Sequence, residues 1–244
     1  MNPTVTEEQS LESIGFVFIH GAGLNSGIWK TVANQLEYPY LLVDFPQRQS
    51  PKAMRHHLTL HDYTTHIQKQ IEAWKVKKFV IVAHSLGGIP ALQIASAMQD
   101  RLAGFAAVGA AIPANGGSFL SIMPPAKRAM MHVLLRVFGT QPPESAIRSG
   151  LCNDLTAEQT EEIVRGFAPE SIRVYTDRTE APIPNAPKLY VKLTNDREFG
   201  LPQQDRIISH LAPDHVELLD AGHLPMLSKP NELHRALTDF LARI

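Results

Sequence analysis

Short apolar runs alternate along the chain with longer segments in which apolar residues recur every three or four positions. Six runs are typical of strands, at residues 16–20, 40–45, 79–83, 105–110, 189–194 and 215–220. Most of them are apolar throughout rather than at every second position, as in strands that are covered on both faces. The pattern predicts an α/β fold with a mostly parallel six-stranded sheet flanked by helices.

The segments between these runs carry the signals of helix starts. Thr59 and Asp62 can form a capping box ahead of an apolar stripe, which predicts a helix that begins there. The last helix is expected to start near Pro230. Its apolar residues fall on one side, and we expect them to pack against the sheet: Leu233, Leu237, Phe240 and Leu241.

The regular alternation stops between residues 113 and 187, a segment that holds nine of the 18 prolines. Helix signals continue inside it, from Pro124 to Phe138 and from Thr156 onward. We therefore predict a helical cap at 113–187, inserted into a single core domain formed by 1–112 and 188–244. A long crossover without a function is the alternative interpretation.

One local motif indicates a nucleophile. Ser85 follows an apolar run directly, precedes a helix-like segment, and has small residues two positions away on each side, Ala83 and Gly87. A strand that turns sharply into a helix forces strained dihedral angles on such a serine, and bulky flanking side chains would collide with it. The motif predicts a nucleophile elbow, although an ordinary glycine-rich loop would have a similar sequence.

A general base and an acid follow in the chain order that this arrangement needs. His223 comes just after the last apolar run, and Asp196 comes just after the preceding one. We predict that Ser85, His223 and Asp196 form a catalytic triad. Three other carboxylates also lie downstream of the serine and remain weaker candidates for the acid: Asp177, Asp205 and Asp220.

A glycine-rich turn, residues 20–23, follows the first apolar run. Such a turn can aim backbone N–H groups at the oxyanion of a tetrahedral intermediate. We expect the amides of Ala22 and Leu86 to be these donors. A phosphate site is the alternative, but the glycine patterns of nucleotide-binding loops are absent.

Other histidines are expected to have structural roles. His84 adjoins the predicted nucleophile, and we expect it to pack or to fix the elbow. Four further histidines, His56, His57, His61 and His66, lack nearby cysteine or carboxylate partners and are expected on a solvated face. No metal or cofactor is predicted.

Composition narrows the range of partners. The chain has 23 Lys and Arg against 24 Asp and Glu, so it lacks the basic surface that binds nucleic acid. No apolar stretch reaches the roughly 18 residues of a membrane span. Residues 1–13 lack a signal-peptide pattern, and the lone Cys152 cannot form an internal disulfide. We expect a cytoplasmic protein, as a monomer or a homodimer.

Three motifs together resemble the α/β-hydrolase superfamily: HGAG at 20–23, AHSLGG at 83–88 and AGHLPMLSKP at 221–230. Within it, the chain is similar to the branch of plant methyl esterases and hydroxynitrile lyases with their bacterial esterase relatives. The resemblance covers 15–109 and 187–244. The lyases carry a threonine in the first turn and a lysine after the catalytic histidine, whereas this chain has Gly21 and Leu224. Both differences favour ester hydrolysis.

We therefore predict a serine esterase that cleaves small or medium apolar carboxylic esters through an acyl-enzyme. Its expected substrate-binding residues are Gly21, Phe119, Met123 and Leu224. Other cap residues could line an apolar pocket over Ser85 or simply attach the cap to the core: Met130, Met131, Leu134 and Phe138. A small-molecule receptor with slow turnover, carbon–carbon bond hydrolysis and cyanohydrin cleavage remain alternatives.

Overall fold

The computed structural model describes residues 14–48 and 55–244. Its centre is a six-stranded sheet in the order β2-β1-β3-β4-β5-β6, and every neighbouring pair is parallel. The strands are β1 (Ile14–Ile19), β2 (Tyr40–Val43), β3 (Lys78–His84), β4 (Leu102–Val108), β5 (Lys188–Leu193) and β6 (His215–Leu219). All six predicted strands are confirmed. Residues 1–13, for which no signal peptide is expected, lie outside the described residues.

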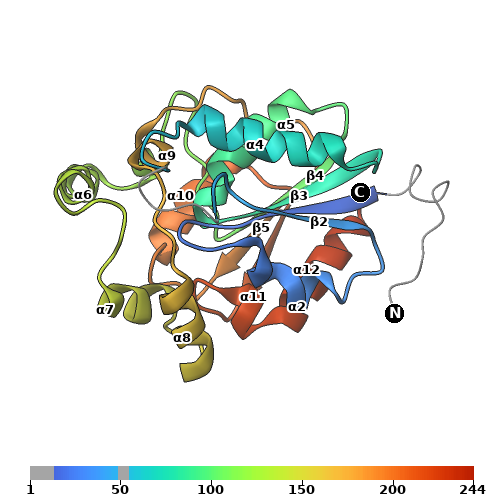
Figure 1. Cartoon of the computed structure of the whole chain (residues 1–244). Helices are drawn as coiled ribbons and strands as arrows, with labels where there is room; N and C mark the ends of the chain where they lie inside the picture. Colours follow the sequence, from blue (N-terminus) through green and yellow to red (C-terminus); the bar gives the residue numbers. More distant parts are fainter. Residues whose placement is uncertain (1–13, 49–54) are drawn as a thin grey trace.

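Helices cover both faces of this sheet (Figure 1). On one face pack α4 (Leu60–Ala73), α5 (Gly88–Ala97) and α10 (Leu201–Leu211), which share a core cluster with alternate residues of the central strands. On the other face pack α2 (Lys30–Ala33), α11 (Pro225–Ser228) and α12 (Pro230–Leu241). The central strands β1, β3 and β4 are buried along most of their length. Continuous apolar runs are therefore explained by burial on two sides.

The predicted helix starts are also found. The Thr59 side chain accepts a hydrogen bond from the Asp62 amide, and the Asp62 carboxylate accepts one from the Thr59 amide, so both halves of the capping box form. Helix α12 begins at Pro230, and its four predicted apolar residues are buried.

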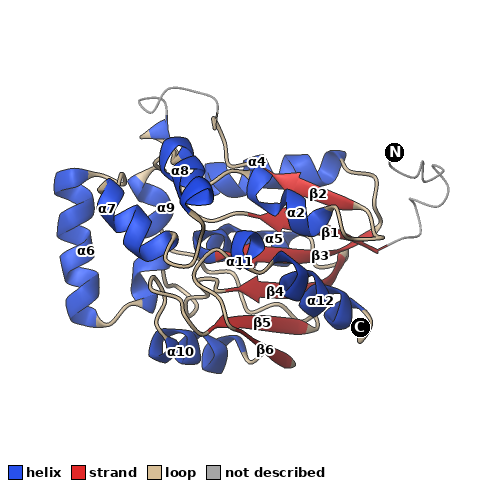
Figure 2. Cartoon of the chain, turned by 90° about the horizontal axis from the view of Figure 1, so that it is seen from below, coloured by secondary structure: helices blue, strands red, loops and turns tan. Residues whose placement is uncertain are grey.

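The 113–187 segment connects β4 to β5, which lie side by side in the sheet. It contains η3 (Phe119–Ile122), α6 (Pro125–Phe138), α7 (Glu144–Ala146), the π-helical turn η4 (Ile147–Leu151), α8 (Ala157–Gly166) and α9 (Ile172–Thr176). In Figures 1 and 2, α6, α7 and α8 gather at the end of the sheet opposite the C-terminus. Because β4 and β5 pair directly, the strands before and after this segment belong to one sheet.

The apolar stripe on α6, expected to face a pocket over Ser85 or the core, points mostly to solvent. Met130, Leu134 and Phe138 are 54%, 38% and 72% exposed, so their side chains do not line an enclosed space over Ser85. The side of α6 that faces the core carries Leu135, which is buried, and Met131, which is partly buried. Helical periodicity identified an apolar stripe but not the direction in which it points.

The edge strand β6 is more exposed than the rest of the sheet, since only Leu219 within it is buried. Two short helical turns complete the described elements: η1 (Ser26–Trp29) and η2 (Ser85–Gly87). Over residues 14–48 and 55–244, no helix has the length and apolar character needed to cross a lipid bilayer.

Candidate active site

Ser85 lies at the sharp turn between β3 and α5, within η2. Its φ of 51° is in the left-handed region, which is strained for a residue with a side chain. The backbone of other segments lies very close to this turn. A Cβ on Gly87 would lie 2.5 Å from the carbonyl oxygen of His20, and one on Gly88 would lie 2.4 Å from that of Ala111. The two glycines therefore permit the turn that presents the serine.

Ser85 is hydrogen-bonded to His223, and His223 to Asp196. The distance from Ser85 Oγ to His223 Nε2 is 2.9 Å, and that from His223 Nδ1 to Asp196 Oδ2 is 2.8 Å. An ionised carboxylate only accepts hydrogen bonds, so Nδ1 carries the proton and Nε2 is free to accept from the serine hydroxyl. The three residues singled out in the sequence thus form one buried chain of hydrogen bonds.

Asp196 is held in its ionised form. Its burial raises the pKa of the carboxyl, but attraction to His223 and the hydrogen bonds that it accepts outweigh burial, so its pKa is lowered. The other oxygen, Oδ1, accepts from the backbone amides of Glu198 at 2.8 Å and Phe199 at 3.0 Å. These two amides fix the carboxylate so that Oδ2 faces the imidazole.

The surroundings of His223 favour its protonated form. Burial lowers the pKa of the imidazole, but the charge and hydrogen bond of Asp196, with smaller contributions from Glu198 and Asp154, raise it overall above 6.5. This is the electrostatic setting in which a histidine can take up a proton during a reaction and be stabilised as a cation.

The three weaker candidates for the acid lie elsewhere. Asp177 accepts from the Leu60 amide and from the Arg173 guanidinium. Asp205, on α10, forms an ion pair with Lys192. Asp220 accepts from the side chains of Thr194 and Asn195.

His84 links the elbow to the loop that carries His223. Its Nε2–H donates to the main-chain carbonyl of His223 at 2.8 Å, and the two imidazole rings lie 4.8 Å apart. Burial, followed by repulsion from His223, lowers the pKa of His84 to about 3, so this side chain is neutral. It therefore fixes the elbow against the His223 loop, in agreement with the role expected from the sequence.

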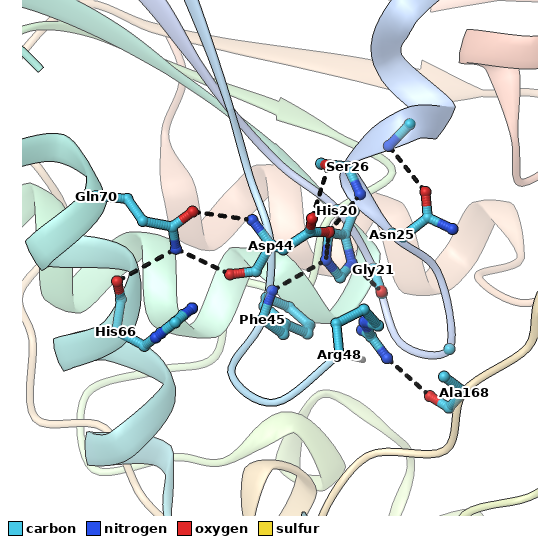
Figure 3. Close-up of polar contacts among 12 residues, drawn as sticks. His20, Gly21, Asn25, Ser26, Asp44, Phe45, Arg48, His66, Gln70 and Ala168 are labelled. Atoms are coloured by element: carbon cyan, nitrogen blue, oxygen red, sulfur yellow. Dashed lines mark hydrogen bonds and ion pairs between the residues drawn. The ribbon is translucent and has the colours of Figure 1, made fainter. Parts of the chain in front are cut away.

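A second histidine, His20, orients the turn at residues 20–23 (Figure 3). Burial and the nearby Arg48 charge lower the pKa of His20 well below 6.5, so the ring is neutral. Its Nε2 accepts from the Phe45 amide at 3.3 Å, and its Nδ1–H donates to the Gly21 carbonyl at 2.8 Å. In a trans peptide the C=O and the following N–H point in opposite directions. The Ala22 amide is consequently fixed facing away from His20.

Asp44 holds the start of η1, just after this turn (Figure 3). Its carboxylate accepts from the amide of Ser26 at 2.7 Å and from the hydroxyl of Ser26 at 2.9 Å. Its backbone is paired with the side-chain amide of Gln70, which donates to the Asp44 carbonyl at 3.0 Å. The start of η1 is thereby attached to the end of β2 and to α4.

The amides of Ala22 and Leu86 donate no hydrogen bond within the described part of the chain. The next amide in the turn, that of Gly23, donates instead to Glu170 at 3.1 Å. The two amides expected from the sequence to stabilise an oxyanion are therefore free to do so.

A buried network around Glu170 was not anticipated from the sequence. Besides the Gly23 amide, the Glu170 carboxylate accepts from Arg48 at 2.6 Å and from the Tyr63 hydroxyl at 2.8 Å. Arg48 also donates to the Ala168 carbonyl at 3.0 Å (Figure 3). This network joins the 113–187 segment to the turn at 20–23. No sequence signal marks it, because its members are scattered along the chain.

The predicted substrate-binding residues differ in their surroundings. Phe119 is buried and contacts the ring of Phe199, which in turn contacts His223 edge-on with centroids 5.4 Å apart. Met123 is partly buried against the same core cluster. Gly21 lies against Ser85 and His84. The prediction for Leu224 is wrong: its side chain is fully buried in the core cluster on the opposite face of the sheet, so it cannot contact substrate.

Metal ligands do not gather in the described part of the chain. No group of three or more His, Cys, Asp or Glu side chains there could hold a metal ion. The histidines at 56, 57, 61 and 66 thus form no such group, and Cys152 is a buried free thiol.

Several solved structures have a fold similar to that of this chain. The fold is similar to that of an extracellular alpha/beta-hydrolase from a Paenibacillus species, described as sharing structural and functional homology with tobacco salicylic acid binding protein 2 (TM-score 0.83, 19% identity, covering 93% of this chain and 98% of that one). It is also similar to the methylesterase MES16 from Arabidopsis (TM-score 0.78, 19% identity, 95% and 100%) and to polyneuridine aldehyde esterase (TM-score 0.78, 18% identity, 94% and 100%).

These neighbours match the branch to which the three sequence motifs pointed. No curated protein sequence matches the chain. The sequence profile of the alpha/beta hydrolase family, however, matches residues 16–236, which is most of the chain. The protein therefore belongs to the alpha/beta hydrolase family.

Proposed function

We propose that this hydrolase is a serine esterase that cleaves small or medium apolar carboxylic esters. The observation that carries the proposal is the continuous hydrogen-bonded chain from Ser85 through His223 to Asp196. A hydroxyl paired with a neutral imidazole, itself oriented by a buried carboxylate, is the arrangement that activates serine for attack on a carbonyl carbon.

In the proposed reaction Ser85 Oγ attacks the ester carbonyl while its proton moves to His223 Nε2. Asp196 stabilises the imidazolium, and the amides of Ala22 and Leu86 donate to the oxyanion of the tetrahedral intermediate. The carbon–oxygen bond then breaks, and the proton on Nε2 passes to the leaving alcohol. Water, deprotonated by His223, attacks the acyl-enzyme in the same way and releases the acid with the free serine.

The choice of ester rests on the residues around the serine. Gly21 places no side chain against Ser85 Cβ, where the lyases have a threonine, and this favours ester hydrolysis over cyanohydrin cleavage. Leu224 stands where the lyases have a lysine, and its side chain is buried in the core, so it brings no charge to the site. The rings of Phe119 and Phe199 beside His223 favour apolar substrates. Two of the similar structures carry the names of esterases, which supports the same choice. We assign the 113–187 segment the role of the cap that completes the substrate site.

Hydrolysis of p-nitrophenyl esters tests the proposal. Wild-type protein should release p-nitrophenol from the acetate and butyrate esters faster than from long-chain acyl esters, and Ser85→Ala should abolish nearly all of this activity. Ser96→Ala, which removes an exposed hydroxyl from α5, is the matched control and should leave the rate unchanged. Activity that survives Ser85→Ala, or a preference for long acyl chains or phosphate esters, would contradict the proposal.

The compartment and the assembly state stay predictions. A buried free thiol and the absence of any disulfide among the described residues fit the cytoplasm. Size-exclusion chromatography with light scattering distinguishes the monomer from the homodimer.

A further inference from the structure

The dipeptide Asn153–Asp154 contacts the two loops that carry His223 and Asp196. It lies in the turn between η4 and α8, within the 113–187 segment. The Asp154 carboxylate accepts a hydrogen bond from the Gly222 amide at 2.5 Å, and the Asn153 side chain donates to the Asn195 carbonyl at 3.0 Å. Gly222 directly precedes His223, and Asn195 directly precedes Asp196. One short segment thus holds the backbone beside the histidine and the backbone beside the acid.

The approach of this dipeptide to the histidine loop requires glycine at position 222. A Cβ there would lie 2.4 Å from Asp154 Oδ1 and 2.6 Å from Asn153 Oδ1. Glycine at position 222 therefore allows both side chains to reach the backbone beside His223 and Asp196.

Asp154 also adds negative charge to the surroundings of His223. The charged groups that act on the imidazole are the carboxylates of Asp196, Glu198 and Asp154, each of which raises the pKa of His223 against the effect of its burial. His84, which packs against the ring, is neutral. Asp154 thus favours the imidazolium that forms when Ser85 attacks.

We propose that Asn153–Asp154 is a clamp through which the 113–187 segment positions His223 and Asp196, with Asp154 as the principal positioning residue. This proposal rests on the esterase function above and extends it. Asp154 acts through the Gly222 backbone and through its charge, without touching substrate. The clamp links the cap to the two loops, so a displacement of the cap displaces the histidine and the acid together.

Three variants separate the hydrogen bonds from the charge. Asp154→Asn keeps an oxygen that can accept from the Gly222 amide but removes the charge. Asp154→Ala removes both, and Asn153→Ala releases only the Asn195 carbonyl. The matched control is Glu158→Gln, which removes an exposed charge from α8 in the same segment. Each variant is measured for kcat and KM across pH, for its thermal midpoint, and for its rate of labelling by a fluorophosphonate.

The clamp predicts a specific pattern. Asp154→Ala should lower kcat and the labelling rate by about 10- to 100-fold with little change in KM, because small misplacements of a catalytic group are costly. Asn153→Ala should lower kcat by less. Asp154→Asn and Asp154→Ala should both move the acid limb of the kcat/KM profile to lower pH, because each removes a charge that raises the pKa of His223. Glu158→Gln should leave the acid limb, kcat and the labelling rate unchanged. If Asp154→Ala does not fold, the clamp is tested by the position of the acid limb of the kcat/KM profile in Asp154→Asn.

Either of two results overturns the clamp: an acid limb that does not move in Asp154→Asn, or an Asp154→Ala protein labelled at the wild-type rate. Failure of the esterase function gives a different result. In that case wild-type protein itself is not labelled by the fluorophosphonate, or Ser85→Ala is labelled equally. If labelling depends on Ser85 but is unchanged by substitution of Asp154, the clamp proposal fails and the esterase function stands.

Discussion

Gly21 lies so close to the predicted nucleophile that a Cβ on it would fall 2.9 Å from Ser85 Cβ and 2.9 Å from His84 Nδ1. Contacts under 3.0 Å require something to shift, and both neighbours are held by the elbow and the His223 loop. Even a methyl group at position 21 should therefore displace the Ser85 side chain.

We expect Gly21→Ala to lower kcat/KM by at least about tenfold, because the methyl group displaces Ser85 or His84 from the hydrogen-bonded chain. Steady-state hydrolysis of p-nitrophenyl acetate measures the effect. Gly166→Ala, where a Cβ meets nothing within 4 Å, is the control and should retain wild-type activity. Equal rates for the two variants would show that Gly21 has no part in shaping the site.

Asp196→Asn should reduce kcat by about 10⁴-fold, the loss that follows when a triad histidine is held in the wrong tautomer. The asparagine amide donates where the carboxylate accepted, so the proton of His223 moves from Nδ1 to Nε2, and Ser85 loses its base. Asp220→Asn provides the comparison, since Asp220 accepts hydrogen bonds from Thr194 and Asn195 instead of His223. A larger loss in Asp220→Asn than in Asp196→Asn would reverse the assignment of the acid.

The pH dependence follows from the electrostatics of His223. The imidazole must be neutral to accept the serine proton, and its pKa is raised above 6.5. Activity should therefore be lost as the pH falls through a midpoint above 6.5, which the kcat/KM profile of the free enzyme reports. Asp196, with its lowered pKa, stays ionised across this range. A midpoint below 6.5 would contradict the electrostatic description of the site.

Glu170→Gln should destabilise the protein by about 3–5 kcal/mol, because it leaves the largely buried Arg48 charge without its partner. Equilibrium urea unfolding measures the change. The comparison is Glu161→Gln, which breaks an ion pair between half-exposed side chains and should cost much less. Similar losses in the two variants would indicate that burial does not set the strength of the Glu170 network.

The elements and the reactive side chains could be predicted because their signals are local. Apolar runs marked the strands, Thr59 and Asp62 marked a helix start, and the small residues around Ser85 marked the elbow. His223 and Asp196 were found because the chain order of the triad is fixed and each follows a strand. These inferences need only neighbouring residues and the rule that parallel strands end at one edge.

Contacts between distant segments could not be predicted in the same way. The periodicity of α6 does not reveal which side faces the core, so Phe138 was expected inward and is exposed. Glu170 meets Arg48 across 122 positions, and Asp154 meets Gly222 across 68 positions. Such pairs depend on how the 113–187 segment packs on the core, and no single-sequence pattern encodes that packing.

Trapping the acyl-enzyme tests the central claim most directly. Wild-type protein is mixed with p-nitrophenyl acetate, quenched in acid within the first turnover, and analysed by intact and peptide mass spectrometry. We predict one acetyl group per chain, on the peptide that contains Ser85, and none in the Ser85→Ala protein. Turnover of the ester without an acetyl group on Ser85, or acetylation at another residue with full activity, would contradict the proposed mechanism.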